Sequence, residues 1–181
     1  MNRPIMCRYL LIVGMILWGC SNIQSPSNTV WTSDPAVHEV DNQMVNVKFE
    51  PQKGTFPYFA FFRLTIINKS DVDLNIDWNA TQYLFNGRAG GVFVFAGIDP
   101  EAVRMGSVPM ETISPGTEFT REIMPMQRIA WNPLKKNTVS ERRISPGILP
   151  AGANGMQLSI HHDQEVTTVP LSVRLSQVAL P

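Results

Sequence analysis

The sequence predicts an all-β protein, a two-sheet β-sandwich of seven to nine short strands. Three observations favour this class. Apolar and polar residues alternate in short runs through most of the chain, which is the pattern of strands with one buried face. Prolines and glycines, 14 and 12 in number, separate these runs as turns. No amphipathic segment is long enough to form a helix of useful length, so a helical layer is not expected.

The first 19 residues have the features of a secretory signal peptide. Two positive charges, Arg3 and Arg8, precede an apolar run over residues 9–18. This run has ten residues, about half of the ~20 that a membrane-spanning helix needs. We therefore expect a signal peptide over residues 1–19 that is removed, with an uncleaved signal anchor as the alternative.

The four residues that end this segment, Leu17–Cys20, resemble the bacterial lipobox. The resemblance implies cleavage before Cys20, a thioether lipid on its thiol and acylation of the new amino terminus. Three acyl chains hold a protein lastingly, because each buried methylene contributes about 0.8 kcal/mol. Ser21, rather than Asp, at the next position implies transfer to the outer membrane. We expect a lipoprotein of the bacterial cell envelope, in the outer membrane and facing the periplasm, with an ordinary secretory signal as the alternative.

Charge and cysteine count exclude several classes of function. Lys plus Arg equal Asp plus Glu at 15 each, so the basic excess of a general nucleic-acid binder is absent. Cys7 leaves with the signal peptide and Cys20 carries lipid, so no free thiol is left. A cysteine nucleophile, a zinc–cysteine site and redox chemistry are excluded for the mature protein. The expected partners are the membrane, through the lipid on Cys20, and an envelope protein.

The rest of the chain divides into a tether and one domain. Residues 20–29 are mostly small and polar and cannot bury enough surface to order themselves, so we expect a lipidated flexible tether. Residues 30–181 form the β-sandwich domain. Its first clear strands cover residues 44–49 and 58–68, and the second is apolar on both faces at its start, as in a central strand.

Two hairpins are expected next. Residues 74–78 alternate again after a polar turn, so this strand should pair with the strand over 58–68. Residues 83–85 and 92–95 should form the second hairpin, because Asn86-Gly87 is a strong signal for a tight turn.

The C-terminal part of the domain contains one short helical turn and further strands. Asp99 as N-cap and Pro100 at the first helical position predict the turn over residues 99–104. Strands are expected over residues 119–124, 126–131, 156–161 and 166–178. Pro170 removes one backbone donor from the last strand, which makes it an edge strand or interrupts it.

This succession of short strands points to a sandwich of the immunoglobulin type, with a closed barrel as the competing arrangement. The segments 62–70, 74–78 and 113–116 resemble small bacterial lipoproteins with an immunoglobulin-like domain. The resemblance covers about residues 44–178. It implies a fold and a location, and its motifs include no catalytic residues.

Candidate metal ligands have plainer interpretations. Acidic residues at alternate positions over 71–77 match the start of a calcium loop, but the glycine required at position six is Ile76. A strand with a solvated acidic face is favoured. His161 and His162 are adjacent on an expected strand and point to opposite faces, so they cannot easily share a metal ion. His38 and a carboxylate such as Asp163 could join one of them in space, but nothing in the spacing requires it. We expect no metal, no cofactor and no catalytic residue.

Aromatic side chains are the remaining candidates for a site. We take Tyr58, Trp78 and Trp131 as a possible surface for a partner or ligand. The aromatic residues around 58–62 are expected mainly in the core, because alternate strand positions pack between sheets. Phe56 and Tyr58, which flank a proline, should be the most exposed of them.

The expected function is that of a non-enzymatic envelope protein whose domain contacts another envelope component. A carbohydrate or peptidoglycan binding module is the alternative, and it would need exposed aromatic rings. A metal-dependent or hydrolytic enzyme is the third possibility and would need histidines or acids to converge in one cleft. The acids available for that purpose are Glu101, Glu111, Glu118 and Glu122.

Overall fold

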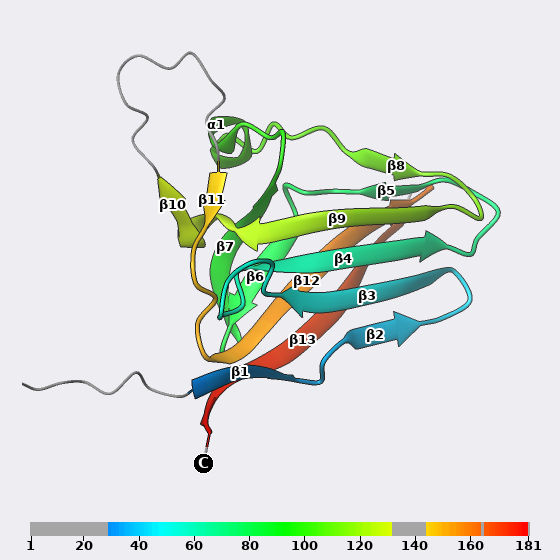
Figure 1. The fold of residues 1–181 in the computed structure, drawn as a ribbon. Coiled ribbons are helices and arrows are strands. Elements are labelled where there is room, and N and C mark those ends of the chain that lie inside the picture. Colours follow the sequence, from blue (N-terminus) through cyan, green and yellow to red (C-terminus); the bar gives the residue numbers. More distant parts are fainter. Residues whose placement is uncertain (1–28, 132–143, 164, 181) are drawn as a thin grey trace, which may run out of the picture.

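A computed structural model describes residues 29–131, 144–163 and 165–180, and they form an all-β fold (Figure 1). The all-β expectation is confirmed: every strand pair in these ranges is antiparallel. The helical turn is confirmed as α1 (Pro100–Arg104), with the Asp99 side chain accepting a hydrogen bond from the backbone N–H of Glu101. No helix in the described ranges is long and apolar enough to span a bilayer. The expected signal peptide, Cys20 and residues 21–28 lie outside the described residues.

The strands are, in chain order, β1 (Thr29–Asp34), β2 (His38–Asp41), β3 (Val45–Gln52), β4 (Phe61–Asn68), β5 (Leu74–Ile76), β6 (Gln82–Phe85), β7 (Arg88–Phe95), β8 (Glu111–Ile113), β9 (Glu118–Pro125), β10 (Ile129–Trp131), β11 (Ile144–Pro146), β12 (Gly152–His162) and β13 (Glu165–Ala179). A single turn of 3-10 helix lies between β9 and β10, at Met126–Arg128.

Eleven of the strands in the described ranges form one sheet. Its main path runs β1-β13-β12-β6-β7-β9-β4-β3-β2, and β5 joins β12 and β8 beside this path. Strands β10 and β11 form a separate two-stranded ladder. The structure therefore differs from the expected seven to nine strands in two separate sheets, because its halves are joined into one curled sheet.

Strand β7 is the reason that the sheet is continuous. Its first part pairs with β6, and its last three residues, Phe93–Phe95, pair with β9. Between these parts the register shifts at Gly90 and Gly91, and Gly91 has a φ of 94° that other residues rarely adopt. This bulge redirects the strand, so the half with β9, β4, β3 and β2 lies over the half with β6, β12, β13 and β1 (Figure 1).

The two expected hairpins have different outcomes. The hairpin of β6 and β7 is confirmed, with Asn86 and Gly87 at φ values of 49° and 76°, as a type I′ turn requires. The expected pairing between residues 58–68 and 74–78 is wrong. Strand β4 pairs with β3 and β9, whereas β5 pairs with β12 and β8. The chain between them crosses from one half of the sheet to the other.

Asn68, the last residue of β4, explains this crossing. It is fully buried. Its backbone N–H donates to the carbonyl of Thr117, and its carbonyl accepts from the N–H of Gly116. Its side-chain Nδ2 donates to the carbonyls of Val72 and Ile113, at 2.7 and 2.8 Å. Because these groups are already paired across both halves of the sheet, the chain after Asn68 does not reverse onto β4.

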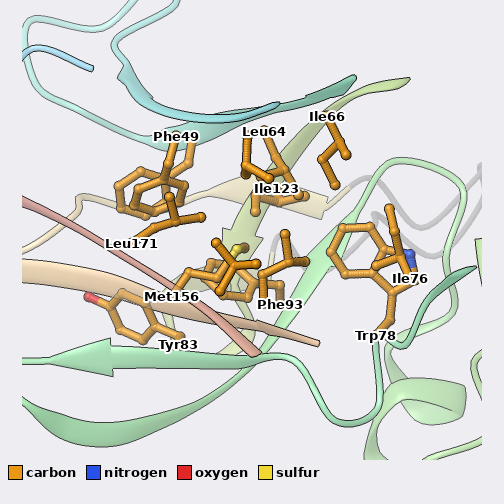
Figure 2. Packing of buried hydrophobic residues seen from close by; sticks show 14 of the residues in the cluster. Phe49, Leu64, Ile66, Ile76, Trp78, Tyr83, Phe93, Ile123, Met156 and Leu171 are labelled. Atoms are coloured by element: carbon orange, nitrogen blue, oxygen red, sulfur yellow. The ribbon is translucent and has the colours of Figure 1, made fainter. Parts of the chain in front are cut away.

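The core lies between the two halves of the sheet (Figure 2). Phe49 and Phe62, on β3 and β4, stack with ring centroids 4.3 Å apart. Phe93 on β7 meets Phe62 edge to face at 6.5 Å and meets Tyr83 on β6 at 5.7 Å. Aromatic contacts thus continue from one half to the other, and each fully buried side chain of this size contributes roughly 1.5–3 kcal/mol.

Strands β1 and β2, at the two ends of the main path, are consecutive in the chain. The Nδ1 atom of His38 on β2 lies 2.9 Å from the backbone nitrogen of Ser172 on β13. Ser172 therefore directs its N–H away from β12, and Pro170, two residues earlier, has the same orientation. The missing donor of Pro170 faces the side of β13 that β1 leaves uncovered, because β1 pairs only with Arg174–Ala179. The strand is therefore neither an edge strand over its whole length nor interrupted at Pro170: β13 lies between β1 and β12, and Pro170 is in the part that pairs with β12 alone.

Candidate interaction surface

The connection between β3 and β4 is rich in aromatic residues, and we call residues 53–60 the aromatic loop. Its ends are held together because the N–H of Ala60 donates to the carbonyl of Gln52 at 2.9 Å. A turn within it is closed by the N–H of Phe56 donating to the carbonyl of Lys53 at 3.1 Å. The loop is therefore held by backbone hydrogen bonds at its ends and within it.

Phe56 and Tyr58 form a ring pair on the aromatic loop. Their ring centroids are 5.1 Å apart and their planes differ by 14°, so they stack. Both residues are half-buried, while Phe59 and Phe62 are buried in the core. Stacking covers one face of each ring, and the rest of the pair is a partly exposed apolar surface that includes one hydroxyl.

The loop is fixed to β1 beneath this pair. Phe59 meets Trp31 edge to face at 6.5 Å between centroids. The Lys53 ammonium lies 5.1 Å from the Phe59 ring centroid and donates a 2.8 Å hydrogen bond to the Trp31 carbonyl. The N–H of Leu149 donates to the Phe59 carbonyl at 2.9 Å. These contacts position the ring pair of Phe56 and Tyr58.

Trp78 does not contribute to such a surface, because it is only 1 % exposed. The alternation of β5 continues as far as this residue and directs the indole into the core. Its Nε1–H donates to Glu111 Oε2 at 2.7 Å, and its ring lies 4.9 Å from that of Phe95. The inclusion of Trp78 in a partner surface is therefore corrected: it is a core residue.

Trp131 is the last residue of β10, where its backbone pairs with Ile144 of β11. Its side chain lies outside the described residues. Of the three aromatic candidates, Tyr58 is therefore the one whose described side chain lies partly at the surface.

A cluster that the sequence analysis missed surrounds Arg121 on β9. Its guanidinium pairs with the carboxylate of Glu111 on β8. The same guanidinium lies 4.8 Å from the ring centroid of Phe95 and 5.2 Å from that of Phe119, in cation–π contact with both. Glu111 also accepts the Trp78 hydrogen bond. We call Trp78, Glu111 and Arg121 the clip, because it connects β8 in one half of the sheet to β9 in the other.

No local signal in the sequence points to the clip, since Trp78 precedes Glu111 by 33 residues and the consecutive strands β8 and β9 do not pair with each other. The clip also changes the interpretation of the candidate acids. Glu111 is engaged with Arg121, Glu101 pairs with Arg104, and Glu122 lies 3.4 Å from Arg63. Three of the four glutamates considered for a carboxylate pair are therefore each paired with an arginine.

The three histidines have separate neighbours. His38 Nδ1 contacts the backbone of Ser172, as described above. His161 Nε2 lies 3.4 Å from Asp77 Oδ2, whereas His162 Nδ1 lies 4.0 Å from Asp163 Oδ2. Within the described ranges, no three His, Cys, Asp or Glu residues are grouped so that they could hold a metal ion.

The acidic segment at 71–77 is in part a strand, as the sequence favours. Leu74 and Ile76 are fully buried, while Asp71 and Asp73 are exposed. Asp77 has a structural role at its end: its Oδ1 accepts the N–H groups of Asn79 and Ala80, at 2.9 and 3.1 Å. This carboxylate oxygen therefore caps a turn.

The partly exposed ring pair on the aromatic loop is thus the best candidate surface in the described part of the chain. No family model, curated protein or solved structure matches this chain. The chemistry of the surface itself, two apolar rings with one hydroxyl, suits contact with another protein or with the apolar face of a sugar.

Proposed function

We propose that this protein is a lipid-anchored component of the bacterial cell envelope, whose non-catalytic β domain binds another envelope component. The observation that carries the proposal is the position of Cys20. It follows a short apolar segment in the motif Leu17–Cys20 and precedes the first strand, at Thr29, by nine residues. Lipid on Cys20 would hold the folded domain close to the membrane.

The non-catalytic character is supported by how the candidate chemical groups are used. Glu111 binds Trp78 and Arg121, and Asp77 caps a turn beside His161. Such contacts stabilise the fold and leave these groups without the convergent geometry that acid–base catalysis needs.

We place the contact with the partner at Phe56 and Tyr58. Aromatic residues are enriched among the side chains that dominate binding energy, and this pair is held rigidly from below by Phe59 and Trp31. A rigid apolar surface loses little conformational entropy on binding. An envelope protein with a complementary apolar patch is the expected partner.

A carbohydrate or peptidoglycan fragment is the second candidate partner. The partial exposure of both rings favours it, because sugars bind to aromatic faces. The mutual stacking of the two rings counts against it, since each ring covers one face of the other. We therefore rank a protein partner first.

We further propose an outer-membrane location facing the periplasm. Ser21, next to Cys20, supports it. The mature chain would have 13 basic and 15 acidic residues, hence a charge of −2. We also infer that the curled sheet works as an immunoglobulin-like sandwich, because its two halves enclose one core between them.

The test is crosslinking in intact cells followed by purification of the protein. We expect palmitate incorporation and one crosslinked envelope protein with the wild type, and neither with Cys20→Ala. Joint replacement of Phe56 and Tyr58 by Ser should reduce recovery of the partner about tenfold, because such anchors are worth 1 kcal/mol or more. Met110→Ser, at a residue that is 47 % exposed, is the matched control and should retain the partner.

Three results would contradict the proposal. Absence of palmitate from the wild type would remove the anchor. Recovery of peptidoglycan fragments in place of a protein would favour the second candidate. Unchanged recovery with the double serine variant would show that the aromatic loop is not the contact.

A further inference from the structure

The corner of the domain where β1 begins is also the corner where β13 ends (Figure 1). The two strands pair antiparallel, with Thr29 opposite Ala179 and Val30 opposite Val178. The first and last described residues of the chain are therefore neighbours. We call residues 29–33 and 175–180 the N-terminal corner.

Exposed apolar side chains are concentrated at this corner. Val30, Val178 and Leu180 are 37 %, 49 % and 46 % exposed, and they are three of the eight exposed large hydrophobic residues in the described part of the chain. Val30 and Val178 lie on the outer face of the sheet, because alternate positions such as Trp31 and Leu175 face inward, and Leu180 follows directly after the end of β13. Clustered apolar exposure of this kind marks a contact surface more often than scattered exposure does.

The two segments of this corner have no charged side chain of their own, and the charge that lies beside them is the Lys53 ammonium bonded to the Trp31 carbonyl. Neither segment, 29–33 or 175–180, contains an Asp, Glu, Lys or Arg. The nearest charges in the register are Asp34 and Arg174, which face each other at the far end of β1. Uncharged side chains can enter the headgroup region of a bilayer without the cost of desolvating an ion. The neighbouring Lys53 ammonium is compatible with that region, because anionic headgroups attract lysine.

The short chain between Cys20 and this corner indicates what covers the surface. Cys20 and Thr29 are nine residues apart, and nine residues span about 32 Å at most. A lipid on Cys20 therefore keeps the N-terminal corner near the membrane, and this is the part of the domain that the tether holds most closely.

We propose that Val30, Val178 and Leu180 rest on the phospholipid surface in which the Cys20 lipid is inserted. This contact rests on the anchoring proposed above. It gives the domain a fixed orientation, with the outer face of β1 and β13 toward the lipid. The anchor and the apolar corner then act as two linked membrane contacts, of which the second binds at the high effective concentration set by the first.

The test uses the lipidated full-length protein in vesicles of phosphatidylethanolamine and phosphatidylglycerol that contain a small fraction of nitroxide-labelled lipid. Val178→Cys and Met110→Cys are each labelled with an environment-sensitive fluorophore. Lipid occupies the Cys20 thiol, so the new cysteine takes the label. The two sites are matched, since the native residues are 49 % and 47 % exposed. We expect the lipid nitroxide to quench the label at 178 at least about threefold more than the label at 110.

A second comparison separates contact from simple proximity. Val30→Asp places a charge opposite the label at 178 and should reduce quenching to the level seen at 110. Val166→Asp makes the same change at a 58 % exposed valine near the other end of β13 and should leave quenching unchanged.

The outcomes distinguish this inference from the proposed function. Protein that fails to float with the vesicles has no anchor, and both proposals are then overturned. Protein that floats but shows equal quenching at 178 and 110 keeps the anchor and overturns only the membrane contact of the corner.

Discussion

At the scale of single residues, the core contains a buried polar pair whose bonds are complete. Tyr83 is 1 % exposed, and its hydroxyl donates to Asn154 Oδ1 at 2.6 Å. Asn154 is fully buried, and its Nδ2 donates to the carbonyls of Pro150 and Gly152 at 2.9 and 3.0 Å. Burial raises the pKa of Tyr83 to about 12, against an ordinary pKa of about 10 for tyrosine.

This pKa predicts how stability depends on pH. Above pH 10 the phenol of the unfolded chain loses its proton, whereas the folded protein keeps it until about pH 12. The contribution of Tyr83 is fully present below pH 10 and is lost between about pH 10 and 12. Two pKa units correspond to about 2.7 kcal/mol in the free energy of unfolding. Urea unfolding at pH 7, 10 and 11.5 measures it.

Tyr83→Phe is the variant for this measurement. At pH 7 we expect a loss of about 1–2 kcal/mol, because Asn154 Oδ1 is left without its donor. The difference between wild type and variant should shrink above pH 10, since the variant has no phenol at this position to titrate. A difference that stays constant up to pH 11.5 would disprove the assignment.

The residue scale also shows what the sequence could and could not predict about the candidate surface. Phe56 and Tyr58 flank Pro57, which interrupts the strand pattern, so their partial exposure is predictable. Trp78 lies at the end of an alternating run that predicts an inward side chain, and it was still included in the surface. The alternation was the correct signal for Trp78, whereas its hydrogen bond to Glu111 and its contact with Phe95 depend on distant segments that local sequence does not indicate.

At the scale of elements, local turn chemistry decided which hairpin was predictable. The turn Asn86-Gly87 needs no distant partner, because positive φ angles at two adjacent residues already reverse the chain. The turn after β4 depends on bonds from Asn68 to Ile113, Gly116 and Thr117, which are more than 40 residues away. The polar composition after β4 indicates a turn, but it does not indicate which strand pairs with β4.

The short ladder of β10 and β11 ends in a close approach that only glycine permits. A Cβ atom on Gly147 would lie 2.2 Å from the carbonyl oxygen of Arg128. The same glycine donates a 2.7 Å hydrogen bond to that carbonyl, and the chain then leads to Leu149, which is fully buried. The atom in the way is a backbone oxygen, so it cannot move aside as the end of a flexible side chain would.

Gly147→Ala should therefore lower the free energy of unfolding by about 2–4 kcal/mol, because the bond to Arg128 must break and Leu149 must shift. Gly87→Ala is the control: nothing lies within 4 Å of its Cβ position, and its positive φ costs about 1 kcal/mol. Chemical denaturation of both variants checks the difference. An equal loss of unfolding free energy in both variants would mean that the close approach at Gly147 does not affect stability.

At the scale of the whole molecule, the clip joins two halves of the sheet that β7 also connects covalently. Glu111 and Arg121 have side chains that are 26 % and 31 % exposed, so their pair is partly shielded from water. Arg63 and Glu122 form a comparable pair on the surface, with side chains 42 % and 56 % exposed. Comparing the two pairs shows how much an ion pair contributes to stability when it is partly shielded from water and when it is exposed to water.

Glu111→Ala should cost about 2–3 kcal/mol, since it leaves the Trp78 N–H and the Arg121 guanidinium without their acceptor. Glu122→Ala, the control, should cost less than about 1 kcal/mol. Thermal unfolding compares the two. A smaller loss for Glu111→Ala than for Glu122→Ala would mean that the clip does not hold the halves together.

The all-β class was predictable at this scale because alternation reports one buried face per strand. The continuity of the sheet was not, since it depends on the bulge at Gly90 and Gly91 that turns β7 from one half to the other. A pair of glycines in a strand indicates irregularity without indicating its direction.

Lys53, which donates a hydrogen bond to the Trp31 carbonyl, also affects how copies of this protein meet at the edge of the sheet. Strand β1 ends the main path of the sheet, and an unprotected end of this kind can recruit strands from other copies of the same protein. Lys53 occupies one acceptor of β1 and places a positive charge beside it. Copies held on a membrane, as proposed above, would meet far more often than copies in solution, and a charge at this position discourages their edge-to-edge aggregation.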